Sequence, residues 1–266
     1  GSNSALISMP AGHARPGSYF ACGASVAGTR HIRDQIPCED AWAGVILPGA
    51  LIIAVADGLS SAEHGGKGAD IAVSSSVKNA ADGYKAGEPD IAALIRSAMS
   101  AGREDIDDHA LSEGLDISSF ATTLLLAFLT PDGAFCGHIG DGACVTLSEG
   151  EPSLLSVPGT AEYANETAVL TAQNWESQCR ISHRAADAII CATDGCQGAL
   201  IRREDGAYIP YSPFVVPLVR SLGQYIHEGR DLNTEVADLL SSSRMRALSS
   251  DDMTLAVGFS LSGEPF

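Results

Sequence analysis

The chain is poor in basic residues and has no long apolar run. It contains 16 Lys plus Arg against 33 Asp plus Glu, which gives a formal net charge of −17 over 266 residues. A surface of this charge repels nucleic-acid phosphates and anionic lipid headgroups, so neither nucleic acid nor membrane is an expected partner. No apolar stretch approaches the roughly 20 residues that span a bilayer, and the N-terminal end lacks the regions of a signal peptide. These absences predict a cytoplasmic protein.

Several catalytic and metal-binding motifs are also missing. The seven cysteines form no Cys-x-x-Cys pair, which argues against structural zinc. There is no Gly-x-Ser-x-Gly elbow of an esterase. The run 65–68 does not complete a phosphate-binding loop, because Ser61 stands where that motif needs glycine. We expect the cysteines to be reduced thiols of the core.

The size of the chain favours one domain. With 45% hydrophobic residues, 266 residues bury one sizeable core, although length alone also allows two small domains. No low-complexity linker or internal repeat divides the sequence, so we expect a single domain over 1–266. Residues 149–178 contain Pro152, Pro158 and a polar run at 162–167. This composition predicts a loop-rich flap at about 149–178.

Hydrophobic periodicity predicts helices in pairs and strands in hairpins. Apolar residues recur at spacings of three and four in the helical segments, and short apolar runs end in turn residues elsewhere. Helices are expected at 66–84, 90–109, 213–226 and 234–248, and strands at 19–26, 51–56, 121–129, 134–139, 143–147, 179–182, 188–193 and 253–260. Links as short as 130–133 allow only antiparallel neighbours. The pattern predicts an α+β fold of antiparallel sheets layered with helices.

Four aspartates stand at the edges of predicted strands, namely Asp40, Asp57, Asp194 and Asp251. Carboxylates that converge from strand ends cannot all stay ionised in one cleft unless cations neutralise them. Oxygen ligands select magnesium, manganese or calcium. The sequence therefore predicts a two-metal hydrolytic site.

Asp-Gly is also one of the commonest turn dipeptides, so any one of these aspartates taken singly is weak evidence for a metal site. The chain has six such dipeptides, at Asp57, Asp82, Asp132, Asp141, Asp194 and Asp205. We interpret Asp132-Gly133 as a hairpin turn only. Asp82-Gly83 and Asp205-Gly206 are interpreted as loops.

The order of six short motifs resembles the type 2C, or PPM, protein phosphatases along nearly the whole chain. The motifs are Glu39-Asp40, Asp57-Gly58, Ala121-Thr122-Thr123, Gly140-Asp141-Gly142, Thr193-Asp194-Gly195 and Asp251-Asp252-Met253-Thr254. The run 163–167 and the spacing from His31 to Pro37 are most similar to a bacterial branch of that family. The resemblance implies a four-layer α/β/β/α sandwich, with two central, mainly antiparallel sheets flanked by helix pairs.

The resemblance also implies an activity. A member of this family is a metal-dependent serine/threonine protein phosphatase, in which a metal-bridging water or hydroxide attacks phosphoserine or phosphothreonine in line. Its cofactors would be two divalent cations, manganese or magnesium. Its substrate would be a phosphorylated protein of a cognate serine/threonine kinase, and we expect a monomer. The alternative is an inactive phosphatase fold that binds phosphoproteins or regulates a kinase, and the retained Asp57, Asp194 and Asp251 favour the enzyme.

Residue roles follow from the same resemblance. Asp57 would bridge both metals while the Gly58 carbonyl completes one site, where a missing Cβ lets the backbone approach the ion. Asp194 and Asp251 would complete the other site. Asp141, with Asp194, matches the position of a third, weaker metal, and a plain Gly-Asp-Gly turn is the equal alternative.

Two acidic residues of the early motif would act on the metals indirectly, through water. Asp40 would act through a bound water, and Glu39 would hold metal-bound waters from outside the ligand shell. Both roles rest on the match of Glu39-Asp40 to the family motif.

The chain departs from the family in two places. Leu59 stands where eukaryotic members have the histidine that serves as general acid. His64 lies nearby, but we interpret it as a solvated histidine at the head of a helix, so that a bound water protonates the leaving group. The phosphate-binding arginine of the family has no exact counterpart, and His31 or Arg33 is the predicted phosphate contact.

Overall fold

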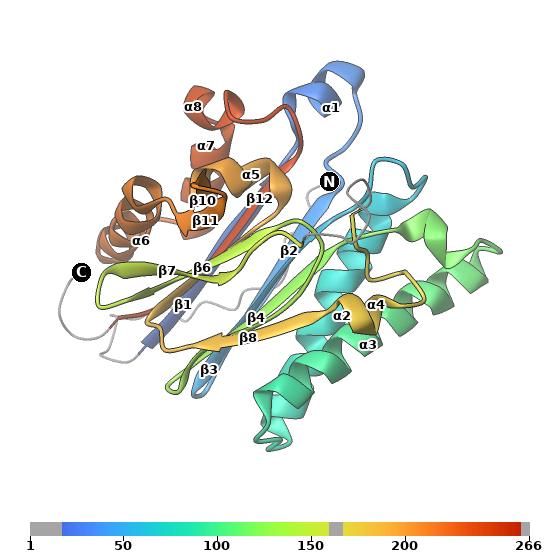
Figure 1. Cartoon of the computed structure of the whole chain (residues 1–266), viewed down its shortest axis with the longest axis horizontal. Coiled ribbons are helices and arrows are strands. Elements are labelled where there is room, and N and C mark those ends of the chain that lie inside the picture. The colour runs from blue at the N-terminus through green and yellow to red at the C-terminus, as the bar shows by residue number, and fades with distance from the viewer. Residues whose placement is uncertain (1–17, 160–166, 262–266) are drawn as a thin grey trace.

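Two five-stranded antiparallel sheets form the centre of the molecule (Figure 1). The computed structural model describes residues 18–159 and 167–261. In the first sheet the strand order is β2-β3-β4-β5-β8. Its strands are β2 (Asp40–Leu47), β3 (Ala50–Asp57), β4 (Leu124–Thr130), β5 (Gly133–Ile139) and β8 (Arg180–Arg184). Two-residue turns join β2 to β3 and β4 to β5, which is why these neighbours are antiparallel.

The second sheet has the strand order β1-β12-β9-β6-β7. Its strands are β1 (Ser18–Val26), β12 (Met253–Leu261), β9 (Ala188–Ala192), β6 (Ala143–Ser148) and β7 (Glu151–Ser156). The first and last strands of the described chain pair along their whole length, from Ser18 with Leu261 to Val26 with Met253. This pairing ties both ends of the described chain into one sheet.

Helices cover the outer face of each sheet (Figure 1). The long pair α2 (Gly65–Lys85) and α3 (Ile91–Ser112) packs on the first sheet. The second sheet is covered by α5 (Asp194–Leu200), α6 (Ser212–His227), α7 (Leu232–Ser241) and α8 (Ser243–Arg246). The shorter elements are α1 (Thr29–Asp34), a 3₁₀ turn η1 (Ile117–Phe120), α4 (Trp175–Gln178) and the hairpin β10 (Ile201–Glu204) and β11 (Ala207–Pro210). None of the described helices is long and apolar enough to cross a membrane.

Strand β3 shows why the sheets are stacked. Its side chains alternate, with Ile52 and Ala54 packed toward α2 and α3, and Ile53 and Val55 packed toward the second sheet. Because both faces of β3 are buried, its sequence is a continuous apolar run rather than a polar and apolar alternation. A third core lies between the second sheet and α5–α8. Three apolar interfaces therefore hold four layers together.

The predicted fold class is confirmed, and the α/β/β/α layering follows the resemblance. The predicted helix 234–248 is wrong as one element, because the backbone of Ser242 is extended and its hydroxyl accepts a hydrogen bond from the Met245 N–H at the start of α8. The strand predicted at 121–129 begins only at Leu124. The prediction also missed β2 and β7, both of which pair with a neighbour as sheet edges.

The range 149–178 contains both β7 and α4, and residues 160–166 lie outside the described part of the chain. Most of the polar run 162–167 lies outside the described residues. The same holds for the run 163–167, which resembles the bacterial branch of the family. A flap at about 149–178 within a single domain over 1–266 therefore stays a prediction.

A buried histidine joins the two sheets near this range. His138 on β5 is 1% exposed, and its Nδ1 lies 2.7 Å from the Ser156 hydroxyl at the end of β7 and 3.0 Å from the Arg180 guanidinium on β8. Burial, followed by the charge of Arg180, lowers the pKa of His138 to about 3. The ring is therefore neutral in the folded protein at neutral pH.

Acid is expected to destabilise the fold through His138. The unfolded chain takes up the proton near pH 6.5 and the folded chain only near pH 3, so this residue's contribution falls as pH drops across that window, by at most about 1.4 kcal/mol per pH unit. Urea unfolding at several pH values should show a shallower pH slope in His138→Gln than in wild type. The exposed His227→Gln serves as control, and an unchanged slope in His138→Gln would contradict the assignment.

Candidate metal centre

Most of the predicted site residues line a small polar cleft of about 150 Å³ at one end of the sheets. Six acidic side chains line it, namely Glu39, Asp57, Asp141, Asp194, Asp251 and Asp252. Of the described residues that line the cleft, His31 alone has a side chain that can carry positive charge. The negative charge of the cleft therefore favours cations and, without them, repels phosphate.

Three carboxylates in the cleft come close enough to share an ion. One oxygen each of Asp57, Asp141 and Asp194 lie within 4.8 Å of one another. Asp57 ends β3, Asp141 lies in the link between β5 and β6, and Asp194 begins α5, which one residue separates from β9. Strand ends of both sheets therefore bring together residues that are far apart in the sequence.

The main chain of Asp57 is fixed by two threonines. The Thr123 hydroxyl accepts a hydrogen bond from the Asp57 N–H at 2.9 Å, and the Asp57 carbonyl accepts bonds from the Thr122 hydroxyl and the Thr123 N–H. Both threonines are buried. The Thr-Thr motif therefore holds the carboxylate at the end of β3 without occupying the cleft itself.

Two glycines are required by close approach of the backbone. A Cβ on Gly58 would lie 2.2 Å from the carbonyl carbon of Gly65, where α2 begins. Gly140 has a φ of +125°, and a Cβ there would lie 2.6 Å from the Thr123 side chain. The first glycine brings the head of α2 against Asp57, and the second turns the chain into Asp141.

Burial opposes ionisation in several carboxylates in and beside the cleft. Burial raises the pKa of Asp57 well above its usual range, and the charges of Asp40, Asp194 and Asp141 add to the effect. The pKa of Asp194 and of Asp40 is also raised, again first by burial. A group of crowded, desolvated carboxylates needs either protons or cations, and all its donors are hard oxygens, so the residues fit divalent metal ions of the magnesium or manganese type.

Asp40 lies behind this group and does not line the cleft. It pairs in register with Asp57 across β2 and β3, is 7% exposed, and accepts a hydrogen bond from the Thr193 hydroxyl at 2.6 Å. The same Thr193 oxygen accepts a bond from the Thr254 N–H. Glu39, by contrast, reaches the cleft directly.

Asp252, for which the sequence predicted no role, organises the part of the cleft that contains His31 and Glu39. This buried carboxylate accepts hydrogen bonds from the Gly28 N–H at 2.7 Å and the Glu39 N–H at 2.6 Å, and lies 2.9 Å from His31 Nδ1. The other ring nitrogen of His31 is 3.7 Å from Glu39. His31 is thereby held with its ring in the cleft.

The two predicted phosphate contacts lie in different environments, both on α1. His31 is 3% exposed and lines the cleft. The Arg33 side chain is 74% exposed and pairs with Asp34, outside the cleft. Arg30, which no sequence motif indicated, has its guanidinium 3.6 Å from Asp251 at the rim. The i, i+3 spacing of Arg30 and Arg33 could have indicated a short helix that carries both arginines. A helix as short as α1, however, gives no detectable periodicity in the sequence.

The comparisons with known proteins agree on one family. The family model described as Protein phosphatase 2C matches residues 27–241. Serine/threonine-protein phosphatase 3 of Escherichia coli (strain K12) is 31% identical over 244 residues, which cover 88% of this chain and 95% of that protein. The chain belongs to the protein phosphatase 2C family. It is a metal-dependent serine/threonine protein phosphatase.

Solved structures of low identity share the fold. The Mycobacterium tuberculosis serine/threonine phosphatase PstP/Ppp superimposes with a TM-score of 0.60 at 16% identity, over 91% of this chain and 98% of that one. The S. agalactiae serine/threonine phosphatase gives a TM-score of 0.60 at 14% identity, over 92% and 100%. A structure of the PstP catalytic domain is described as a complex with two manganese ions and gives a TM-score of 0.53 at 16% identity, over 91% and 97%.

This phosphatase carries no histidine next to its central Asp-Gly motif. Leu59 lines the cleft instead. His64 heads α2 and stacks on Phe120 with 5.1 Å between ring centroids, and it is not among the residues that line the cleft. The predicted place of His64 at the head of the helix is confirmed, but its ring is half buried against Phe120 rather than solvated, which favours packing over proton transfer.

Replacing Gly58 with alanine is expected to destabilise this phosphatase by about 3 kcal/mol or more, because the added methyl meets backbone that cannot rotate away. Gly198→Ala in α5 is the matched control, since a Cβ there has nothing within 4 Å. Thermal and urea unfolding of both variants check this. A Gly58→Ala protein as stable as Gly198→Ala would show that the head of α2 moves freely from Asp57.

Proposed function

We propose that this phosphatase works through two divalent cations, manganese or magnesium, held by Asp57, Asp194 and Asp251 with the Gly58 carbonyl. The observation that carries the proposal is the crowding of Asp57, Asp141 and Asp194 within 4.8 Å in a cleft that also contains Asp251. The manganese pair of the PstP catalytic domain supports the same number of ions. Cations bound by these carboxylates would lower the pKa of a water and neutralise charge at phosphorus.

The third-metal role of Asp141 is part of this proposal. Its main chain is held by the Gln197 amide, which donates to the Asp141 carbonyl at 2.7 Å, while its carboxylate accepts a bond from the Thr167 hydroxyl. A residue in a plain turn does not need to approach two other half-buried carboxylates. The geometry thus supports a ligand role over the Gly-Asp-Gly turn alone.

Glu39 and Asp40 would support the metal centre without direct bonds to it. Glu39 reaches the cleft, where its carboxylate can accept hydrogen bonds from water bound to the cations. Asp40 is backed by Thr193 and lies beside Asp57, so it would act on the site through a bound water.

The phosphate group would be received at the rim by Arg30 and inside the cleft by His31. Arg30 is exposed and only loosely paired with Asp251, so its guanidinium is available to a phosphate oxygen. His31 is orientated by Asp252 and presents its other nitrogen toward Glu39. The predicted role of Arg33 has less support, because Arg33 pairs with Asp34 in solvent.

The substrate we propose is a protein phosphorylated by a cognate serine/threonine kinase, and the enzyme is proposed to act as a cytoplasmic monomer. The acidic surface disfavours nucleic acid and anionic membranes as partners. The seven cysteines are unpaired, which suits a reducing compartment.

Chelation is the first test. Hydrolysis of p-nitrophenyl phosphate should stop in EDTA and return with manganese or magnesium. Asp57→Asn and Asp194→Asn should each lower turnover by at least about 100-fold, because loss of a ligand exceeds the effect of losing a supporting group. Asp132→Asn, in the β4–β5 turn, is the matched control and should leave turnover unchanged.

A second measurement separates lost chemistry from lost folding. In metal-free buffer the Asp57→Asn protein should melt no lower than wild type, because burial opposes the charge that it removes. Added manganese should raise the melting temperature of wild type but not of the variant. Full turnover after exhaustive chelation would refute the metal assignment. So would a manganese-induced rise in melting temperature equal to that of wild type in both Asp57→Asn and Asp194→Asn.

Arg30→Gln should raise KM for p-nitrophenyl phosphate about tenfold or more, as expected for loss of a charge-assisted hydrogen bond to phosphate. Arg33→Gln removes the same charge three residues away and should change KM little. A manganese titration guards against an indirect effect through Asp251, since the apparent metal affinity of Arg30→Gln should stay near wild type. Equal effects of the two variants would count against Arg30 as the phosphate contact.

A further inference from the structure

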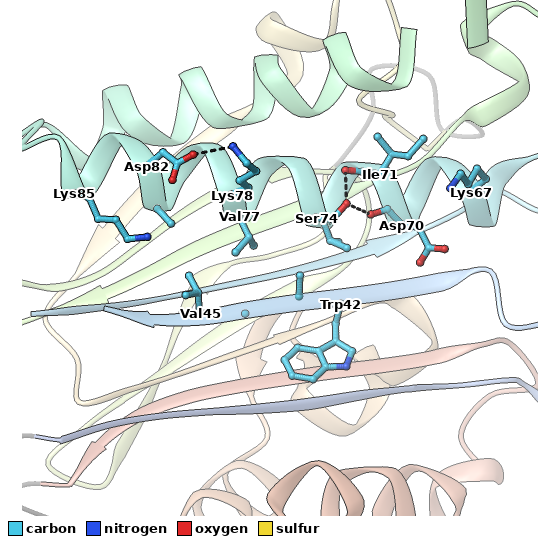
Figure 2. Close-up of a pocket in the computed structure, with 14 residues that line it drawn as sticks. Trp42, Val45, Lys67, Asp70, Ile71, Ser74, Val77, Lys78, Asp82 and Lys85 are labelled. Atoms are coloured by element: carbon cyan, nitrogen blue, oxygen red, sulfur yellow. Dashed lines mark hydrogen bonds and ion pairs between the residues drawn. The ribbon is translucent and has the colours of Figure 1, made fainter. Parts of the chain in front are cut away.

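An open groove runs along the outer side of the first sheet, between β2 and α2 (Figure 2). It has a volume of about 550 Å³ and is larger than the catalytic cleft. Its floor is apolar, and Figure 2 shows Val45 on the side of β2 that faces α2, with Trp42 on the opposite side. Val45 and Ile71 are only half buried, so the groove presents apolar surface to solvent.

All three lysines of the chain line this groove. Lys67, Lys78 and Lys85 lie on α2, and no other lysine occurs in the 266 residues. Two aspartates also line it: Asp82 forms an ion pair with Lys78 at 2.9 Å, and Asp70 lies nearer the head of α2. Three positive charges against two negative ones make the groove an exception on a protein whose net charge is −17.

Helix geometry places the lysines in one row. At 3.6 residues per turn, positions 67, 78 and 85 fall within about 20° of one another around the axis of α2, and the row is about 27 Å long. All three side chains are exposed. An extended chain that rises about 3.3 Å per residue would need roughly eight residues to follow the row.

The opposite wall of the groove offers main-chain groups. In the first sheet β2 is an edge strand, and among the described residues it pairs only with β3. An edge strand leaves alternate N–H and C=O groups available to an added strand. The groove therefore combines backbone pairing on one side with a row of cations on the other, which is the chemistry of extended-peptide recognition.

The groove begins next to the catalytic cleft. Lys67 follows the Gly65-Gly66 entry of α2, where Gly65 packs against Gly58 and a Cβ on Gly66 would lie 3.1 Å from the Cα of Glu39. Gly58 and Glu39 both line the cleft. A polypeptide whose phosphorylated residue is in the cleft can therefore continue directly into the groove.

We propose that the β2–α2 groove binds an acidic, extended segment of the phosphoprotein substrate, about eight residues long and adjacent to the phosphorylated residue. This inference rests on the proposed phosphatase function and adds a substrate class to it. The acidic residues of the segment would meet the lysine row, and its main chain would lie along the free edge of β2.

The test compares substrates on the metal-loaded full chain. The substrates are p-nitrophenyl phosphate, a phosphothreonine peptide with a neutral Gly/Ser flank of eight residues, and two peptides in which glutamates replace alternate flank residues on either side. Wild type should hydrolyse at least one glutamate peptide with a kcat/KM about tenfold above the neutral peptide, mainly through KM. Lys67→Gln, Lys78→Gln, Lys85→Gln combined should abolish that preference and leave p-nitrophenyl phosphate unchanged.

A matched variant controls for overall charge. Arg184→Gln, Arg203→Gln and Arg220→Gln combined remove the same number of exposed cations from other elements and should keep the preference. An equal loss of the preference for glutamate peptides in both triple variants would overturn the proposal, because the preference would then depend on the net charge of the protein rather than on the groove. The absence of any preference for either glutamate peptide in wild type would overturn it as well.

Binding and assembly measurements keep the outcomes separate. Fluorescence anisotropy of a labelled glutamate peptide reports the groove even for an enzyme without turnover, so failure of hydrolysis counts against the proposed function and failure of binding counts against the groove. Sedimentation identifies the other occupant, a second copy of this chain. A dimer that dissociates when the three lysines are replaced would overturn the peptide assignment.

Discussion

Repulsion among desolvated carboxylates is the constraint around which the rest of the structure is arranged. Asp57, Asp141 and Asp194 approach within 4.8 Å, and burial raises the pKa of Asp57 and Asp194. Such a group is unfavourable by itself, and it persists because the three apolar interfaces of the sandwich fix the strand ends that carry it. Bound cations would relieve the repulsion among the carboxylates, and that relief would contribute to the affinity of the site for metal. The fold thus holds the carboxylates in an arrangement that is favourable only with metal bound.

Neutral hydrogen-bonding groups do the positioning in such a site. Thr122 and Thr123 hold the main chain of Asp57, and the Thr193 hydroxyl supports Asp40. A lysine or arginine in those places would compete with the cations for the same carboxylates, whereas a hydroxyl orientates without cancelling charge. The exception is Asp252, a carboxylate that holds His31 and the Glu39 main chain and thereby ties α1 to the early motif.

The sequence predicted the fold class and the acidic residues of the cleft for physical reasons. Buried strands such as β3 end in Asp-Gly, so the apolar run and the carboxylate are visible together. Arg30 and the splitting of α7 from α8 were not visible, because one turn of helix has no measurable period and the cap at Ser242 depends on a single hydrogen bond. Asp252 was visible only as a neighbour of Asp251, since its partners are more than 200 residues away in the sequence.

Charge also decides how a phosphoprotein approaches this enzyme. A chain of net charge −17 repels a phosphorylated, acidic substrate everywhere except where positive charge is concentrated. The six acidic side chains of the cleft oppose phosphate binding unless cations neutralise their charge, and the proposed contacts of Arg30 and His31 add to that attraction. The lysine row of α2 is the neighbouring surface where anionic side chains would meet positive charge. Because that row starts beside Gly58 and Glu39, attraction at the groove and reaction in the cleft can act on one continuous segment of substrate. The general acidity then works as discrimination, since proteins that do not match both positive regions are repelled by the rest of the surface.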